Sequence, residues 1–203
     1  VLFRSVSKVV YNNSSSSSSF PVGSIVRSEV IGVQSYRVIT SERELKFLER
    51  VDGFENSNCN DTTSPRLSAA SHLGVLGTTG LTAYFGMIRV GMVQPVDTVL
   101  VSGAAGATGS IACQIAKRVV GCRAVIGTAG TDDKCRWLEQ NGIVDAAVNY
   151  KKAGASLSKA IRGALKKVLE EKNQGAAAER IAEQWPLAMV LWVLSVREAQ
   201  RKI

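Results

Sequence analysis

The sequence predicts an α/β protein built on a doubly wound parallel sheet of the Rossmann type, of which part is present. Strand and helix patterns alternate from residue 97 to residue 149, and three glycines separate the first strand from the first helix. In addition, 45% of the 203 residues are hydrophobic, so the chain can bury a core and is not disordered throughout. Together these features indicate a domain in which helices cover a buried sheet.

The first strand and helix form the clearest pattern in the chain. Residues 97–102 (DTVLVS) are a short β-branched run, as expected for a buried parallel strand. After the glycines, Ile111, Ile115 and Val119 recur at helical spacing and predict the buried side of a helix. Gly121 follows as the signal that ends this helix.

A second strand, a second helix and a third strand follow directly. Residues 123–127 (RAVIG) and 145–149 (DAAVN) have the pattern of strands. Between them, Thr131 is a candidate N-cap and Gly142 lies just past the helix end. This order is the mononucleotide-binding half of a doubly wound fold, with right-handed crossovers.

The region before this unit has a different character. The serine run 14–19 predicts that residues 1–19 form a flexible segment, because these side chains bury nothing. Residues 21–26 and 34–39 are typical of short strands, and the polar run 56–66 predicts a surface loop.

Charge gathers at the other end of the chain. Residues 151–203 carry 11 Lys+Arg and 5 Asp+Glu, so they hold most of the net charge of +8. Lys and Glu alternate there at helical spacing and no recognition motif is present, so we expect a basic helical tail over 162–203 and no nucleic-acid partner. The longest apolar run, 187–196, falls short of the roughly 18 residues that span a bilayer.

Cysteine usage and the first residues indicate the compartment. The four cysteines are scattered and form no CxxC pair, so neither a disulfide framework nor a zinc site is predicted. Residues 1–11 lack the pattern of a signal peptide. We therefore expect a reduced cytoplasmic protein without a membrane anchor.

The glycines at 103, 106 and 109 are a spaced variant of the dinucleotide-binding fingerprint. Gly103 and Gly106 allow a tight turn and close approach of backbone to a pyrophosphate, and Gly109 allows the helix to pack on the strand. The helix N-terminus around Thr108 then offers unpaired N–H groups to phosphate oxygens. The alternative is a tight turn that serves packing alone, but the flanking strand and helix favour binding.

The end of the second strand indicates which dinucleotide is used. An NAD enzyme usually carries an acidic residue there for the ribose 2′-hydroxyl, but the stretch around Thr128 holds no carboxylate. Asp132 and Asp133 are suited to the helix N-terminus instead. Lys134 can meet a 2′-phosphate, or it is an ordinary solvated lysine. The missing carboxylate favours NADP(H).

Four blocks resemble one enzyme family. LGTTGLTAYFGM (76–87), VSGAAGATG (101–109), GTDDKC (130–135) and DAAVNYKK (145–152) occur in the order and spacing of the zinc-independent medium-chain dehydrogenase/reductases. The similarity is to the group of leukotriene B4 dehydrogenase, prostaglandin reductase and alkenal double-bond reductases, and it covers roughly residues 21–161.

The resemblance implies a domain plan and a reaction. Residues 20–70 would be a remnant of a GroES-like β domain with its linker, and residues 71–161 part of a Rossmann NADP-binding domain. Members reduce the carbon–carbon double bond of small α,β-unsaturated aldehydes and ketones with NADPH and are commonly homodimers. Because most of the first domain and half of the second lack a counterpart here, the resemblance also implies a truncated product.

Site residues follow from the resemblance by position. The loop would hold the pyrophosphate with Gly103, Gly106, Ala107, Thr108 and Gly109. The 2′-phosphate would meet Lys134 and Tyr150 beside Thr128, and Thr82 would face the nicotinamide. Tyr150 is otherwise a half-packed aromatic residue at a strand end.

No catalytic acid can be named from the sequence. Tyr84 is a donor by type only, and His72 has the pattern of a structural or surface residue. Two alternatives to the alkenal reductase stay open. The chain is an NADP-binding remnant without turnover, or it is a quinone oxidoreductase of the same superfamily.

Overall fold

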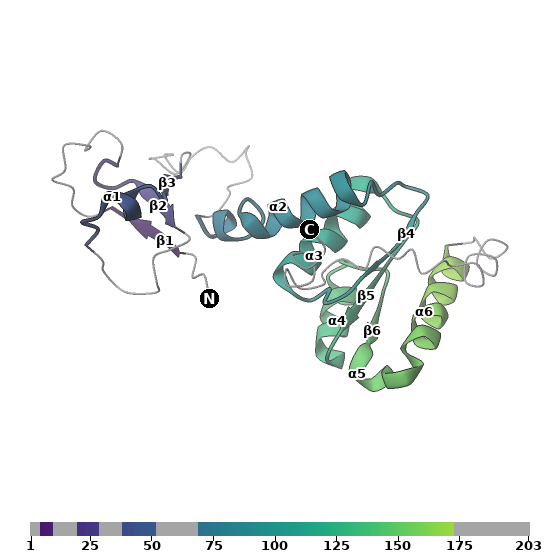
Figure 1. Cartoon of the computed structure of the whole chain (residues 1–203). Coiled ribbons are helices and arrows are strands. Elements are labelled where there is room, and N and C mark those ends of the chain that lie inside the picture. Colours follow the sequence, from purple (N-terminus) through teal and green to yellow (C-terminus); the bar gives the residue numbers. More distant parts are fainter. Residues whose placement is uncertain (1–4, 10–19, 29–37, 52–68, 173–203) are drawn as a thin grey trace, which may run out of the picture. The chain divides into compact units, whose positions relative to one another are not determined.

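The computed structural model describes residues 5–9, 20–28, 38–51 and 69–172 (Figure 1). The chain divides into two compact units, Val1–Thr78 and Thr79–Ile203. Each unit is built around its own three-stranded sheet. Among the described residues, no helix combines the length and apolar character needed to cross a bilayer.

The first unit holds an antiparallel sheet in the order β1-β2-β3. Its strands are β1 (Ser5–Lys8), β2 (Ile25–Ser28) and β3 (Leu48–Arg50). Arg27 of β2 lies opposite Glu49 of β3 and forms an ion pair with it. The short helix α1 (Glu42–Leu45) precedes β3 and is capped by the hydroxyl of Ser41, and the 3-10 helix Ala69–Leu73 also belongs to this unit.

Only part of the prediction for this unit is confirmed. The strand expected at the end of the turn in 21–26 is β2, which begins at Ile25 and ends two residues beyond the expected segment. The expectation that residues 1–19 are flexible is wrong for β1, because pairing with β2 orders these four residues. Val38 and Ile39 lie outside any strand. Residues 34–37, the serine run and the predicted loop 56–66 lie outside the described residues.

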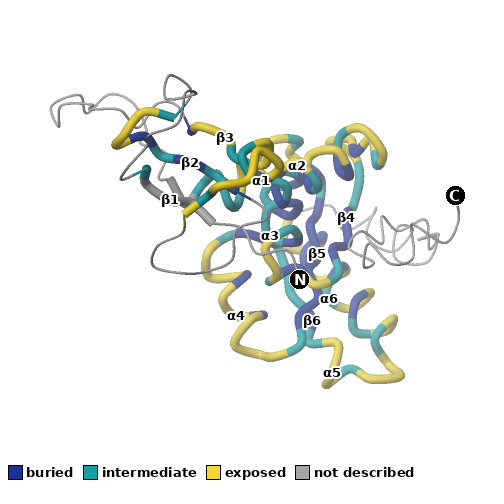
Figure 2. Tube along the Cα trace, turned by 60° about the vertical axis from the view of Figure 1, so that its left-hand side comes forward, coloured by how far each residue is buried: buried dark blue, intermediate teal, exposed yellow. Residues whose placement is uncertain are grey.

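The second unit contains the predicted parallel sheet. Its order is β4 (Thr98–Val101), β5 (Ala124–Ala129) and β6 (Ala146–Asn149), with Val99 opposite Val125. All six residues of the central strand β5 are buried, and Figure 2 shows them in dark blue. The three strands confirm the expected ones to within two residues at either end.

Two helices cover one face of this sheet. They are α3 (Ala107–Gln114), which continues as a π-helical segment over Ile115–Val120, and α4 (Asp132–Gln140). Gly121 ends the first in the left-handed conformation at φ +75°, and the hydroxyl of Thr131 accepts the Lys134 N–H at 3.4 Å at the start of the second. Both helix limits follow the predicted capping signals.

The buried side of α3 differs from the predicted one. Val119 is 75% exposed, and Ile111 and Ile115 are half-buried at the edge of the core. The fully buried positions carry small side chains, Ala112, Cys113 and Ala116. These small residues face the core, and the prediction from the spacing of the large residues therefore placed the contact face of α3 wrongly.

A long helix covers the opposite face. After α5 (Tyr150–Ala153) and a short 3-10 turn, α6 (Leu157–Glu171) runs along the sheet (Figure 1). Its buried residues pack against Leu100 of β4 and Ile126 of β5, and they are Ile161, Leu165, Val168 and Leu169. Alternate residues of a strand face opposite sides, so Val99 and Val125 face α3 and α4 while Leu100 and Ile126 face α6.

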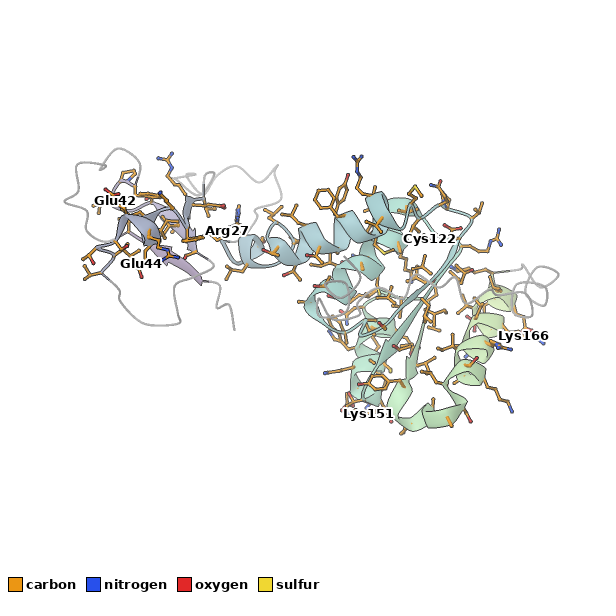
Figure 3. The ribbon with its side chains drawn as sticks, viewed as in Figure 1. Arg27, Glu42, Glu44, Cys122, Lys151 and Lys166 are labelled. Atoms are coloured by element: carbon orange, nitrogen blue, oxygen red, sulfur yellow. The ribbon has the colours of Figure 1, made fainter. Side chains whose placement is uncertain are left out.

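The helix α6 corrects the expected end of the nucleotide-binding region. The boundary at residue 161 falls inside α6, and three of its four buried residues lie beyond it. The structure therefore joins residues 162–171 to the sheet, where an exposed basic tail was expected. Its basic residues occupy the outer face, as with Lys166 in Figure 3. The rest of the expected tail, 173–203, lies outside the described residues.

We expect Val168→Ala to destabilise the protein by about 2 kcal/mol, since it removes two buried methyl groups and leaves a small cavity. Val168 is 4% exposed, whereas the side chain of its neighbour Lys167 is 78% exposed. Lys167→Ala is therefore the matched control, expected to change stability by less than about 0.5 kcal/mol. Urea denaturation followed by circular dichroism measures both. Equal stabilities of the two variants would contradict the packing of α6 on the sheet.

A partly buried charge cluster joins the amino ends of β5 and β6 to two helices. One carboxylate oxygen of Asp145 accepts the Val125 N–H at 2.7 Å. The other lies 3.2 Å from the ammonium of Lys117 and 3.1 Å from that of Lys172. Burial acts to raise the pKa of Asp145, but the N–H bond and the two ammonium groups outweigh it and lower the pKa below its ordinary value.

Candidate nucleotide-binding site

The glycine loop connects the carboxyl end of β4 to the N-terminus of α3. Gly103 adopts φ +59°, a left-handed conformation that favours glycine. The Gly106 N–H donates to the Gly103 carbonyl at 2.8 Å, which closes the turn. Gly106 is then the extended N-cap residue of α3. The first two glycines thus make the tight turn that their spacing predicted.

Gly109 lies where no side chain fits. A Cβ atom there would lie 2.4 Å from the Gly103 carbonyl oxygen and 3.0 Å from the Ala104 Cα. The loop is also tied to the neighbouring strand, because the Ala104 N–H donates to the Thr128 carbonyl at 2.9 Å. Close packing of α3 on the strand end therefore depends on the third glycine, as the fingerprint requires.

The N-terminus of α3 offers free donors. The first intrahelical bond runs from the Ser110 N–H to the Gly106 carbonyl, so the N–H groups of Ala107, Thr108 and Gly109 have no acceptor within the helix. No side chain of the described residues caps this end. The backbone is therefore arranged to receive an anion at the carboxyl edge of the sheet.

The end of β5 brings a second set of predicted residues together. Thr128 is buried, and the chain turns at Gly130 into α4. A Cβ atom on Gly130 would lie 3.1 Å from the Tyr150 hydroxyl oxygen, so Tyr150 reaches across from the end of β6. The Tyr150 side chain is 43% exposed and is thus not simply a packed core residue. Lys134 is exposed in the first turn of α4.

The two acidic residues in the first turn of α4 are engaged elsewhere. Asp132 forms an ion pair with Lys152 and accepts the Asn149 amide at 2.7 Å. The bonds from Lys152 and Asn149 lower the pKa of Asp132. Asp133 forms an ion pair with Arg136. Neither carboxylate is therefore free to serve the ribose 2′-hydroxyl that an NAD site binds.

The other candidate residues give no catalytic acid. Thr82 is half-buried on α2 (Thr78–Tyr84), and its predicted place beside the nicotinamide stays a prediction. Tyr84 is 47% exposed and packs edge-on against Phe85 at 5.6 Å between ring centroids. His72 belongs to the first unit, where its carbonyl accepts from Arg27 at 3.4 Å.

The described cysteines do not supply a nucleophile. Burial raises the pKa of Cys113 to about 12 and that of Cys122 to about 11, so both stay thiols at neutral pH. In the part of the chain that the structure describes, no three His, Cys, Asp or Glu side chains gather as a metal site.

Comparison with known proteins identifies relatives of this unit. No protein-family model matches the chain. The NADP-dependent oxidoreductase YfmJ of Bacillus subtilis is 50% identical over 96 residues, 47% of this chain and 27% of the relative. Prostaglandin reductase 1 of Bos taurus is 41% identical over 150 residues, 74% of this chain and 40% of the relative. The chain therefore spans less than half the length of these two curated relatives.

Solved structures agree in fold. CurA of Vibrio vulnificus, solved in complex with NADPH, superposes with a TM-score of 0.53 at 31% identity. The matched region is 75% of this chain and 38% of the CurA chain. A mycobacterial protein complexed with NADPH gives a TM-score of 0.51 at 20% identity, over 81% of this chain and 44% of its own. These matches confirm the partial Rossmann-type sheet. Over the residues compared, the chain is similar in sequence to prostaglandin reductase 1 and to YfmJ, and in fold to proteins solved in complex with NADPH.

Proposed function

We propose that this chain is part of an NADPH-dependent oxidoreductase that reduces the carbon–carbon double bond of small α,β-unsaturated aldehydes and ketones. The names of its relatives support an NADP-dependent reductase. The motif blocks support the zinc-independent alkenal reductase branch, a cytoplasmic enzyme and a homodimer. The observation that carries the proposal is the glycine loop, whose third glycine has no room for a Cβ atom.

In this proposal the chain's own residues bind and orient the dinucleotide. The pyrophosphate accepts from the backbone N–H groups of Ala107, Thr108 and Gly109. Gly103 and Gly106 hold the loop in the shape that allows this approach. The dinucleotide supplies the hydride when it is bound, and the protein supplies orientation and electrostatics. Thr82 is proposed to lie on the nicotinamide side.

The adenosine end is proposed to meet Lys134 and Tyr150 beside Thr128. The 2′-phosphate carries close to two negative charges at neutral pH, and the Lys134 ammonium has no partner among the described residues. The two carboxylates that precede it along the chain have other partners, Asp132 with Lys152 and Asp133 with Arg136. Selection of NADPH over NADH thus follows from a free cation and an engaged acid.

Lys134→Ala is expected to weaken NADPH binding about ten-fold and to leave NADH binding within about two-fold, because only NADPH loses a charge-assisted bond. Quenching of nicotinamide fluorescence measures both dissociation constants. Lys134→Arg retains the charge and serves as the control. An equal loss for both dinucleotides would contradict the assignment of Lys134 to the 2′-phosphate.

One experiment tests the activity and separates the alternatives. The purified full chain is mixed with NADPH and a 2-alkenal, and then with NADPH and a quinone, while absorbance at the nicotinamide band is recorded. Oxidation with the alkenal supports the proposal, and oxidation with the quinone alone supports a quinone oxidoreductase. Tight NADPH binding without oxidation by either acceptor contradicts turnover by this chain and leaves the nucleotide-binding remnant.

A further inference from the structure

Two side chains converge above the backbone of Gly130, where β5 passes into α4. A Cβ atom on Gly130 would lie 3.1 Å from the Tyr150 hydroxyl oxygen and 3.4 Å from the Lys151 Cε. Both neighbours come from the start of α5, one strand away in the sheet. Figure 3 shows Lys151 at this end of the sheet. The Tyr150 hydroxyl and the Lys151 stem therefore lie against the backbone of Gly130, at the point where β5 ends.

Of the four basic residues near Gly130, two form ion pairs and two do not. Lys152 is paired with Asp132, and Arg136 is paired with Asp133. The ammonium groups of Lys151 and Lys134 form no ion pair within the described part of the chain, although both lie near the end of β5. Asp132 and Asp133 are thus paired with Lys152 and Arg136, which leaves Lys134 and Lys151 able to bind an added anion.

We propose that Lys151 is a specificity-determining residue that places a second ammonium, in addition to that of Lys134, on the 2′-phosphate of NADP(H). This inference rests on the proposed function, because it adds a residue to the same binding site. A phosphate close to the doubly charged state gains from two cations on different sides. The Lys151 Cε would lie 3.4 Å from a Cβ atom on Gly130, so the ammonium, one bond further along the side chain, is next to the end of β5.

Gly130 contributes by having no side chain, so that Tyr150 and Lys151 can lie close to its backbone. An alanine there would contact the Tyr150 hydroxyl at 3.1 Å and the Lys151 stem at 3.4 Å. Both contacts are to the outer parts of side chains, which can move by a few tenths of an ångström. We expect Gly130→Ala to weaken NADPH binding more than NADH binding, because it shifts the two side chains that face the phosphate.

The test compares dinucleotide binding by the full chain and three variants. Lys151→Ala is expected to weaken NADPH binding about ten-fold and NADH binding by less than about two-fold. Lys151→Arg keeps the charge and is expected to keep most of the NADPH affinity. Lys167→Ala removes the same charge from the exposed face of α6, and it is expected to leave both affinities within about two-fold.

A second readout uses salt and a fragment of the ligand. The NADPH affinity of Lys151→Ala should fall less steeply with added salt than that of the parent chain, because one charged contact is gone. Adenosine 2′,5′-bisphosphate should compete with NADPH less well in this variant. If Lys151→Ala and Lys167→Ala behave alike, or if Lys151→Ala weakens NADPH and NADH equally, the inference is wrong.

Failure of the proposed function has a separate signature. If the parent chain binds neither NADPH nor NADH while circular dichroism shows it folded, the nucleotide site itself is wrong. If the parent chain prefers NADPH and Lys151→Ala retains that preference in full, only the role of Lys151 is wrong.

Discussion

Gly109→Ala is expected to abolish measurable NADPH binding, with a loss of more than about 100-fold, because it separates α3 from the end of β4. The added Cβ atom would lie 2.4 Å from the Gly103 carbonyl oxygen and 3.0 Å from the Ala104 Cα. Both obstacles are backbone atoms, so no side-chain rotation relieves the clash. The helix N-terminus must move outward, and its free N–H groups then no longer converge on one phosphate.

A second glycine provides the control for this substitution. Gly163 lies on the exposed side of α6, and a Cβ atom there meets nothing within 4 Å. Gly163→Ala should therefore stabilise the helix by about 0.5–1 kcal/mol and leave NADPH binding unchanged. Fluorescence titration and urea denaturation of both variants make the comparison. Parental affinity in Gly109→Ala would show that the loop does not hold the dinucleotide.

Asp145→Ala is expected to destabilise the protein by about 2 kcal/mol, because it leaves the buried Val125 N–H without its acceptor and removes the carboxylate partner of two ammonium groups, which keep only backbone carbonyls. The Asp145 side chain is only 10% exposed, and its carboxylate joins Lys117, Lys172 and Val125. Loss of the carboxylate therefore loosens the starts of β5 and β6 and the ends of α3 and α6 together.

The same carboxylate predicts a pH dependence of stability. Because the folded-state pKa of Asp145 is lowered, its contribution is fully present above the unfolded pKa of about 4 and is lost as pH falls through the folded pKa. The difference in unfolding free energy between the parent chain and Asp145→Ala should thus be constant from about pH 5 to about pH 7. It should shrink in more acidic solution, as the Asp145 carboxylate becomes protonated.

An exposed pair supplies the control for Asp145. Asp133 and Arg136 form an ion pair in which the side chains are 85% and 67% exposed. Asp133→Asn should change stability by less than about 0.5 kcal/mol, since solvent screens such a pair. Chemical denaturation at several pH values measures both variants. A loss for Asp145→Ala as small as that for Asp133→Asn would contradict the role given to the charge cluster.

Local patterns were sufficient for the core of the fold. The strands β4, β5 and β6 and the helix limits at Gly121 and Thr131 follow from β-branched runs and capping residues, which act over a few positions. The pairing of β1 with β2 was missed because the partners are separated by a polar serine run. The buried face of α3 was missed because close packing selected Ala112 and Ala116 over the larger Ile111 and Val119.

The site was predictable where one residue type serves one geometric need. The roles of Gly103 and Gly109 in the turn and in helix packing follow from spacing, and the structure shows both. The engagement of Asp132 by Lys152 and the approach of Tyr150 and Lys151 to Gly130 join residues about 20 positions apart. Such contacts depend on strand order in the sheet, which spacing in the sequence does not contain.

The charge cluster and the glycine loop lie at opposite ends of the parallel sheet. Along the central strand β5, the distance from Val125, which Asp145 contacts, to Ala129 is about 13 Å. Many enzymes exchange robustness for turnover because the same residues govern both. Here stability and dinucleotide binding depend on residues in different places. We therefore expect substitutions around Asp145 to change thermal stability while the affinity for the dinucleotide stays constant. Directed evolution of such a protein therefore has two separately adjustable regions, one at each end of the parallel sheet.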